Sequence, residues 1–216
     1  RQTGLRLSHV DGHHHMHLHP TVLRLLLPLA SEFGASAVRV AVADELLFSL
    51  RFDRSHLLLK LAWKLAFAPL CRHAGRVAKR HGLSGANRVY GLMQSGQLRE
   101  RYLVALLQRL AEKANGRGKS RGAGKLKVPE ETGGQALKEQ PLQAPGPVIE
   151  IFCHPSLRQE SSDLGPNPGD LAALLSPAVR ETLTAHGLLL TTYPECMSAQ
   201  ATRQVPLASG APGPEG

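Results

Sequence analysis

Residues 5–20 read Leu5-Arg6-Leu7-Ser8-His9-Val10-Asp11-Gly12-His13-His14-His15-Met16-His17-Leu18-His19-Pro20, and this stretch decides the fold that we expect. Apolar and polar residues alternate from Leu5 to Asp11, which predicts a β-strand ending at a polar cluster. A helix is predicted directly afterwards, over Thr21–Phe33, with Gly34 as its stop signal. Ala37–Val42 is rich in β-branched residues and is predicted to be a second strand.

The rest of the chain continues this alternation of strands and helices. Further helices are predicted over Ser55–His81 (with Pro69 as a kink or a break), Ser95–Glu112 and Pro177–His186. Further strands are predicted over Asn87–Leu92, Val148–Cys153 and Leu188–Thr192. Short apolar strands that alternate with helices are typical of an α/β fold, in which helices cover a parallel sheet or barrel.

Composition divides the chain into four segments. Residues 113–147 contain seven Gly and four Pro with almost no hydrophobic periodicity, which predicts a flexible insertion between the ordered segments 1–112 and 148–198. Residues 199–216 are again rich in Gly and Pro and are predicted to be a loose tail.

Composition and charge restrict the classes of function. The 216 residues are 42% hydrophobic, which suits a single globular domain. Three cysteines without a Cys-x-x-Cys pair argue against a disulfide framework or a cysteine-based zinc site. The sequence has neither a secretory signal nor an uncharged apolar stretch of membrane-spanning length. We therefore expect a cytoplasmic protein.

The basic residues are concentrated in the middle of the chain. Residues 51–127 hold 18 of the 26 Lys and Arg but only three acidic residues. This block carries no nucleic-acid motif and few interleaved aromatics, so we expect no specific nucleic-acid partner. Leu57–Leu70 is strongly apolar, with Lys60 and Lys64 one helical turn apart. That pattern suits a helix lying peripherally on an anionic membrane, on its inner face, and it equally suits an ordinary core helix with a basic outer side.

The histidine cluster is the sharpest chemical signal, because six of the eleven histidines lie between His9 and His19. A helical backbone would place His13 and His17 on one face, whereas an extended one would align every second residue from Asp11 to His19. Either geometry gathers imidazoles, which are common ligands of zinc and similar metals. An expression tag would be an uninterrupted run, and a surface cluster without a role remains the alternative. The cluster follows a strand, where α/β barrels build their active sites.

A second candidate site follows the later strand. Glu150-Ile151-Phe152-Cys153-His154-Pro155 again ends an apolar strand with a polar His-Pro pair. In a parallel sheet His154 would open onto the same end as the histidine cluster, although a single histidine at the end of a strand is more often structural than catalytic.

Asp11-Gly12-His13-His14-His15-Met16-His17 resembles the Asp-(Ser/Gly)-His-x-His-x-His signature of YdjC-like carbohydrate deacetylases, and His154-Pro155 resembles a later motif of that family. Residues 8–110 and 148–193 are similar to its hopanoid-biosynthesis branch. The resemblance implies a distorted α/β barrel and a divalent metal, Mg²⁺ or Zn²⁺. It implies the removal of an acetyl group from an N-acetylglucosaminyl hopanoid lipid, the amino-sugar lipid substrate of that branch.

The same resemblance assigns roles to individual residues. It implies His13 as the first metal ligand and His17 as the second. Asp11 and His15 are implied as supporting residues of catalysis, and His154 as a group that transfers a proton or orients substrate.

The family pattern also places an Asp-Asp pair and a Gly-Leu-His-Leu segment before the histidine motif, and they supply further metal ligands. Neither occurs here, so we expect an incomplete barrel that lacks its first strands. The alternative function is a non-catalytic, metal-binding and membrane-associated family member. The identity of the metal and the oligomeric state, a homodimer included, are left open.

Overall fold

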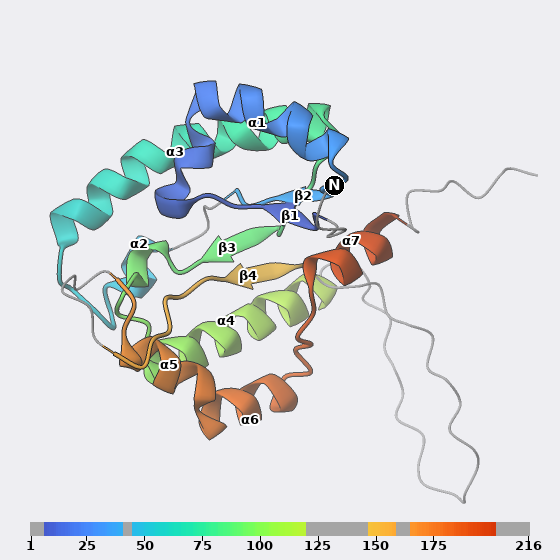
Figure 1. The fold of residues 1–216 in the computed structure, drawn as a ribbon. Coiled ribbons are helices and arrows are strands. Elements are labelled where there is room, and N and C mark those ends of the chain that lie inside the picture. The colour runs from blue at the N-terminus through green and yellow to red at the C-terminus, as the bar shows by residue number, and fades with distance from the viewer. Residues whose placement is uncertain (1–6, 41–44, 120–146, 159–164, 202–216) are drawn as a thin grey trace, which may run out of the picture.

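The computed structural model describes residues 7–40, 45–119, 147–158 and 165–201, which form a mixed α/β fold (Figure 1). Strand β1 (His9–Val10) pairs in parallel with β2 (Ala37–Val38), and β3 (Arg88–Tyr90) pairs in parallel with β4 (Ile149–Ile151). Ser84 links the two pairs: its carbonyl accepts from the Val38 amide at 2.8 Å, and its amide donates to the Ser36 carbonyl at 3.0 Å. Ser84 lies four residues before β3, and this isolated bridge is the described link between two otherwise separate two-stranded sheets.

Helices flank these strands in two groups (Figure 1). Helices α1 (Pro20–Glu32) and α3 (Leu57–Arg80) lie on one side, whereas α4 (Glu100–Lys119), α5 (Pro168–Leu175) and α6 (Pro177–Ala185) lie on the other. The short helix α2 (Leu46–Ser49) contacts the 3₁₀ turn Leu92–Gln94 that follows β3. Helix α7 (Tyr193–Ala201) packs at the opposite end, where Met197 and Cys196 cluster with Ala37. None of the described helices is both long and apolar enough to span a bilayer.

Each strand pair has a hydrophobic core of its own. Leu18, Leu23 and Leu27 pack with Val38 and Ala74, joining α1 and α3 to β2. On the other side α4 contributes Tyr102, Leu103 and Leu106, which pack with Leu98, just before the helix, against Tyr90 and Val179. The first core is mainly aliphatic, whereas two tyrosines, Tyr90 and Tyr102, take part in the second. The two cores hold the carboxyl ends of β1 and β4 in place, where the candidate site lies.

The α/β class and most of the long helices are confirmed, but several boundaries differ from the predicted ones. Helix α3 runs unbroken through Pro69. Proline has no N–H, so the carbonyl of Leu65, four residues earlier, loses its helical hydrogen bond. Both residues are exposed, and water can bond to this carbonyl instead. Helix α4 begins at Glu100 rather than Ser95, since Gly96 has a left-handed φ of 70° that no α-helix accommodates. Its last turns reach Lys119, seven residues into the predicted insertion; residues 120–146 lie outside the described residues.

One predicted strand is absent, and the other four are shorter in the described residues than predicted. Leu188–Thr192 forms no strand and leads directly into α7, with Leu189 and Leu190 about nine-tenths exposed. In β1 only His9 and Val10 are paired, and the first residues of that predicted strand, like 41–44 after β2, lie outside the described residues. The described strands do not close into a barrel, so an incomplete barrel stays a prediction.

Candidate metal centre

The histidine cluster folds as a tight turn immediately after β1. A 3₁₀ helix spans His13–Leu18, yet His14 and His15 within it have left-handed φ values of 50° and 56°. The His15 amide donates to the Gly12 carbonyl at 2.9 Å and closes this turn. Histidine tolerates the left-handed region better than most residues, which is why the sequence can make the turn without glycine. Neither of the predicted alternatives, a strand or an α-helix, is correct.

The turn brings three potential ligands together. One ligand atom each from Asp11, His15 and His17 lies within 4.8 Å of the other two. The three residues differ in burial, since Asp11 is exposed, His15 is half-buried and His17 is 2% exposed. A tetrahedral zinc ion with bonds of 2.0–2.1 Å needs ligand atoms about 3.4 Å apart. To hold an ion, the three side chains would have to rotate so that these atoms approach one another from up to 4.8 Å.

His17 is oriented by the second strand. Its Nε2 lies 2.7 Å from the main-chain oxygen of Arg39, and because a carbonyl can only accept, Nε2 carries the proton. Nδ1, the other ring nitrogen, is buried, has no hydrogen-bond partner and lies 4.0 Å from an Asp11 carboxylate oxygen. Histidines that ligate metals commonly donate their other nitrogen to a backbone carbonyl in this way.

Gly12 makes room for this imidazole. A Cβ atom at Gly12 would stand 2.9 Å from His17 Nδ1, closer than real Cβ contacts allow. The glycine is therefore required by the approach of the ring rather than by its φ, which is −134°.

The His15 ring lies between two aromatic side chains, Phe67 and Phe152. Its ring meets Phe67 of α3 edge-on at 5.4 Å between centroids and Phe152, just after β4, at 5.2 Å. Burial among these groups, with His17 nearby, lowers the pKa of His15 to about 4. The ring is thus neutral at pH 7, and its buried Nδ1 also lacks a hydrogen-bond partner. A neutral ring with an unused nitrogen is the form that binds a metal.

A network of ion pairs and a hydrogen bond connects Asp11 of the cluster to Arg39, Glu150 and Tyr193. Arg39 forms ion pairs with both Asp11 and Glu150, and the Tyr193 hydroxyl donates to Glu150. Burial raises the pKa of Tyr193, and its bond to Glu150 raises it further, so the hydroxyl stays protonated as a donor. The Arg39 guanidinium also lies over the Phe152 ring, 5.3 Å from its centroid. The sequence analysis named Glu150 in the second candidate site without giving it a role, and it missed Tyr193 as part of the site.

The remaining predicted residues lie around this group rather than in it. His13 is exposed and its ring contacts His14, with 3.9 Å between centroids, so the structure does not bring it into the three-residue group. His154 lies beyond Phe152, with 6.0 Å between the two rings, and its buried Nδ1 has no partner. The His154 amide donates to the fully buried carboxylate of Asp170 at 3.0 Å, which fixes this loop.

Comparisons with known proteins give a family, a curated relative and a similar fold. A model described as YdjC-like protein matches residues 1–185. A carbohydrate deacetylase of Brevibacillus brevis is 43% identical over 54 residues, which are 25% of this chain and 20% of that protein. The solved structure of an Enterococcus faecalis V583 protein, described as a cellobiose-phosphate cleavage protein, is similar with a TM-score of 0.52 and 17% identity. That match covers 90% of this chain and 55% of the other. The chain thus spans a fifth to about half of the length of these relatives.

Proposed function

The chain belongs to the YdjC-like protein family, and we propose that it carries the metal centre of a hydrolase that removes the acetyl group from an N-acetylated sugar. The name of the Brevibacillus brevis relative, carbohydrate deacetylase, supports this reaction class. The observation that carries the proposal is the group of Asp11, His15 and His17, in which two buried imidazole nitrogens have no partner.

The donor set fits a catalytic metal. Two imidazoles and one carboxylate are three protein ligands, which leaves a tetrahedral ion one position for water. Two nitrogen donors favour zinc or a similar transition metal over Mg²⁺, which prefers oxygen ligands. When bound, such an ion supplies polarisation of the amide carbonyl and a lowered pKa for its water.

The chain's own residues prepare this chemistry. Arg39 holds the Asp11 carboxylate, and the Arg39 carbonyl keeps the proton of His17 on Nε2. Phe67 and Phe152 shield His15 from water, which keeps its ring neutral. His154, with its unpartnered Nδ1 on the far side of Phe152, is the group that we assign to proton transfer to the leaving amine.

The substrate that we propose is an N-acetylglucosaminyl hopanoid lipid. The support is the resemblance of residues 8–110 and 148–193 to the hopanoid-biosynthesis branch of the family. A soluble N-acetylated sugar carries the same N-acetyl group without the lipid, and it is sufficient for testing the reaction.

Acetate release from an N-acetylglucosaminyl substrate tests the function. We expect release after zinc is added to chelator-treated protein, and a loss of at least about 100-fold in His15→Ala and His17→Ala. His13→Ala is the matched control within the cluster and should retain activity. Zinc binding without any acetate release would instead support the alternative, a non-catalytic metal-binding protein.

A further inference from the structure

Helix α2 and the first half of α3, which contact each other, together expose five leucines. Leu47 and Leu58 are 81% and 82% exposed, and Leu65 is 68% exposed. We call this surface the α2–α3 ridge; its members are Leu47, Leu57, Leu58, Leu61 and Leu65. Clustered exposed leucines of this size mark a binding surface on a soluble domain more often than they occur without a role.

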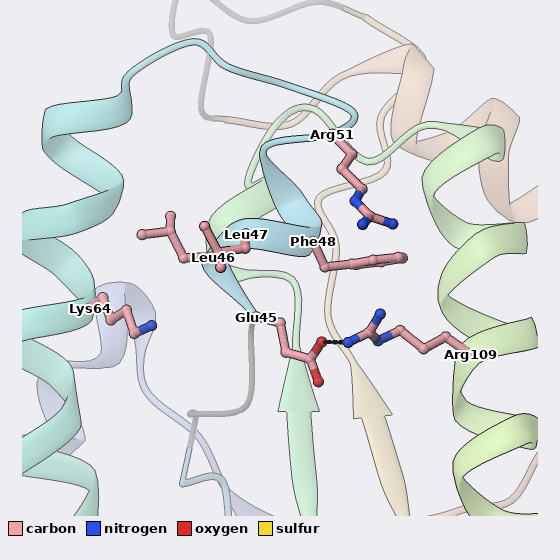
Figure 2. Close-up of a pocket in the computed structure, with 7 residues that line it drawn as sticks. All are labelled: Glu45, Leu46, Leu47, Phe48, Arg51, Lys64 and Arg109. Carbon is pink, nitrogen blue, oxygen red and sulfur yellow. Dashed lines mark ion pairs between the residues drawn. The ribbon is translucent and has the colours of Figure 1, made fainter.

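Cations border the ridge. A cleft of about 440 Å³ lies between α2, α3 and α4, and Figure 2 shows Lys64 reaching into it from the α3 side and Arg51 from above Phe48. Both side chains are exposed, and neither has an acidic partner among the described residues. Glu45, the acid of this cleft, is already paired with Arg109 and Lys113. The cleft therefore carries an excess of positive charge beside the leucines.

The charge of α3 continues this pattern. Leu57–Arg80 contains no acidic residue, and its second half exposes four basic residues, namely Arg72, Arg76, Lys79 and Arg80. Lys60 does not take part, contrary to the sequence-based expectation, because it is 3% exposed and paired with Asp53. The outer side of the helix thus changes from apolar to basic along its length.

A second apolar stripe shows that exposed leucines alone do not define such a surface. Helix α1 exposes Val22, Leu25 and Leu29, but its only basic residue is Arg24, and Glu32 lies near its end. The ridge differs from this stripe in the number of its cations, because α1 has the single Arg24 and α3 has several basic residues and no acid. An occupant with both apolar and anionic parts therefore matches the ridge better than α1.

We propose that the α2–α3 ridge docks on an anionic lipid bilayer, with its leucines in the interface and Arg51 and Lys64 against lipid phosphates. Interfacial helices combine an apolar face with cations at the headgroup level in this manner. Phe67, which packs on His15, lies one turn beyond Lys64 on α3, so docking would hold the metal centre close to the membrane surface. The proposal stands independently of the reaction assigned to that centre.

Flotation with vesicles of phosphatidylcholine, alone or mixed with phosphatidylglycerol, tests this docking. We expect the protein to float with the mixed vesicles only. Leu47→Asp/Leu58→Asp and Arg51→Glu/Lys64→Glu should each weaken this binding about tenfold or more, since all four side chains are on the surface. The matched controls are Leu25→Asp on α1 and Arg180→Glu on α6, which should bind like the wild type.

Three outcomes would overturn the proposal. The protein could fail to float with either vesicle, or the controls could lose binding as much as the ridge variants do. Sedimentation could also show a dimer that Leu47→Asp/Leu58→Asp dissociates without any vesicle binding, which would assign the ridge to a second copy of the chain. Acetate release from a soluble substrate should be unchanged in the ridge variants, so a failure of the reaction would be seen separately.

Discussion

The Nε2 atom of His17 donates a hydrogen bond of 2.7 Å to the main-chain carbonyl of Arg39, and this bond decides which nitrogen of His17 is free. The same Arg39 holds Asp11 through its guanidinium. One residue of the segment that continues β2 thus orients two members of the candidate metal centre, one through its backbone and one through its side chain.

Gly12→Ala should lower the affinity for zinc about tenfold or more without preventing folding. A Cβ at this position would meet His17 Nδ1 at 2.9 Å and displace the ring. Gly34→Ala is the control, because Gly34 has a φ of 82° and open space around its Cβ position. It should cost about 1 kcal/mol of stability and leave zinc affinity unchanged. Calorimetric zinc titration and urea unfolding measure the two effects; equal zinc affinity in both variants would contradict the role of Gly12.

Arg39→Met should reduce the free energy of unfolding by about 3 kcal/mol, because it leaves Asp11 and Glu150 without their shared cation. The Arg39 side chain is 17% exposed, so water replaces the lost partner only in part. Urea unfolding at neutral pH measures the loss. The double variant Arg39→Met/Glu150→Gln should recover part of it, and a double variant no more stable than Arg39→Met would argue against the network.

Acid should destabilise the wild type through His15. The pKa of this ring is about 4 in the folded protein and 6.5 in the unfolded chain, because burial disfavours its charged form. Between these values the unfolded chain binds the proton and the folded protein does not, so the free energy of unfolding falls as pH decreases from about 6.5 to about 4. Urea midpoints across this range should decrease less steeply in His15→Asn. The same slope in both proteins would show that His15 is not buried as described.

Asp170→Ala should destabilise the loop that carries His154. The Asp170 carboxylate is fully buried and accepts from the amides of Leu98, at 3.1 Å, and His154, at 3.0 Å. Its removal leaves two buried donors unpaired, which costs about 2–4 kcal/mol. Hydrogen exchange should show faster exchange of the His154 amide in the variant. Unchanged exchange at this amide would mean that another group fixes the loop.

The sequence predicted those parts of the structure that depend on local pattern. Helix α1 stands within a residue of its predicted bounds, and α6 ends before Gly187, whose φ of 60° gives the expected left-handed stop. The Leu188–Thr192 run was misassigned, since an apolar stretch forms a strand only where a neighbouring strand pairs with it. Helix α5 was missed, although Asn167 before Pro168 is a recognisable helix start.

The sequence predicted where the candidate site lies, but it did not predict which side chains come together there. The density of histidines indicated the turn after β1. The roles of these histidines, however, depend on the left-handed conformations of His14 and His15, and neither a helical nor a strand periodicity predicts such conformations. The pairing of Arg39 with Glu150 joins residues 111 positions apart. A signal did exist for Glu150, because it is the one charged residue inside the apolar stretch Val148–Cys153.

Anomalous X-ray diffraction from a crystal soaked in zinc tests the central claim most directly. We predict one strong peak bonded to Asp11, His15 and His17 at about 2.0–2.2 Å, with Nδ1 as the ligand atom of His17 and its Nε2 still bonded to the Arg39 carbonyl. A peak held by His13 in place of His15 or His17, or no peak within reach of these three residues, would contradict the account.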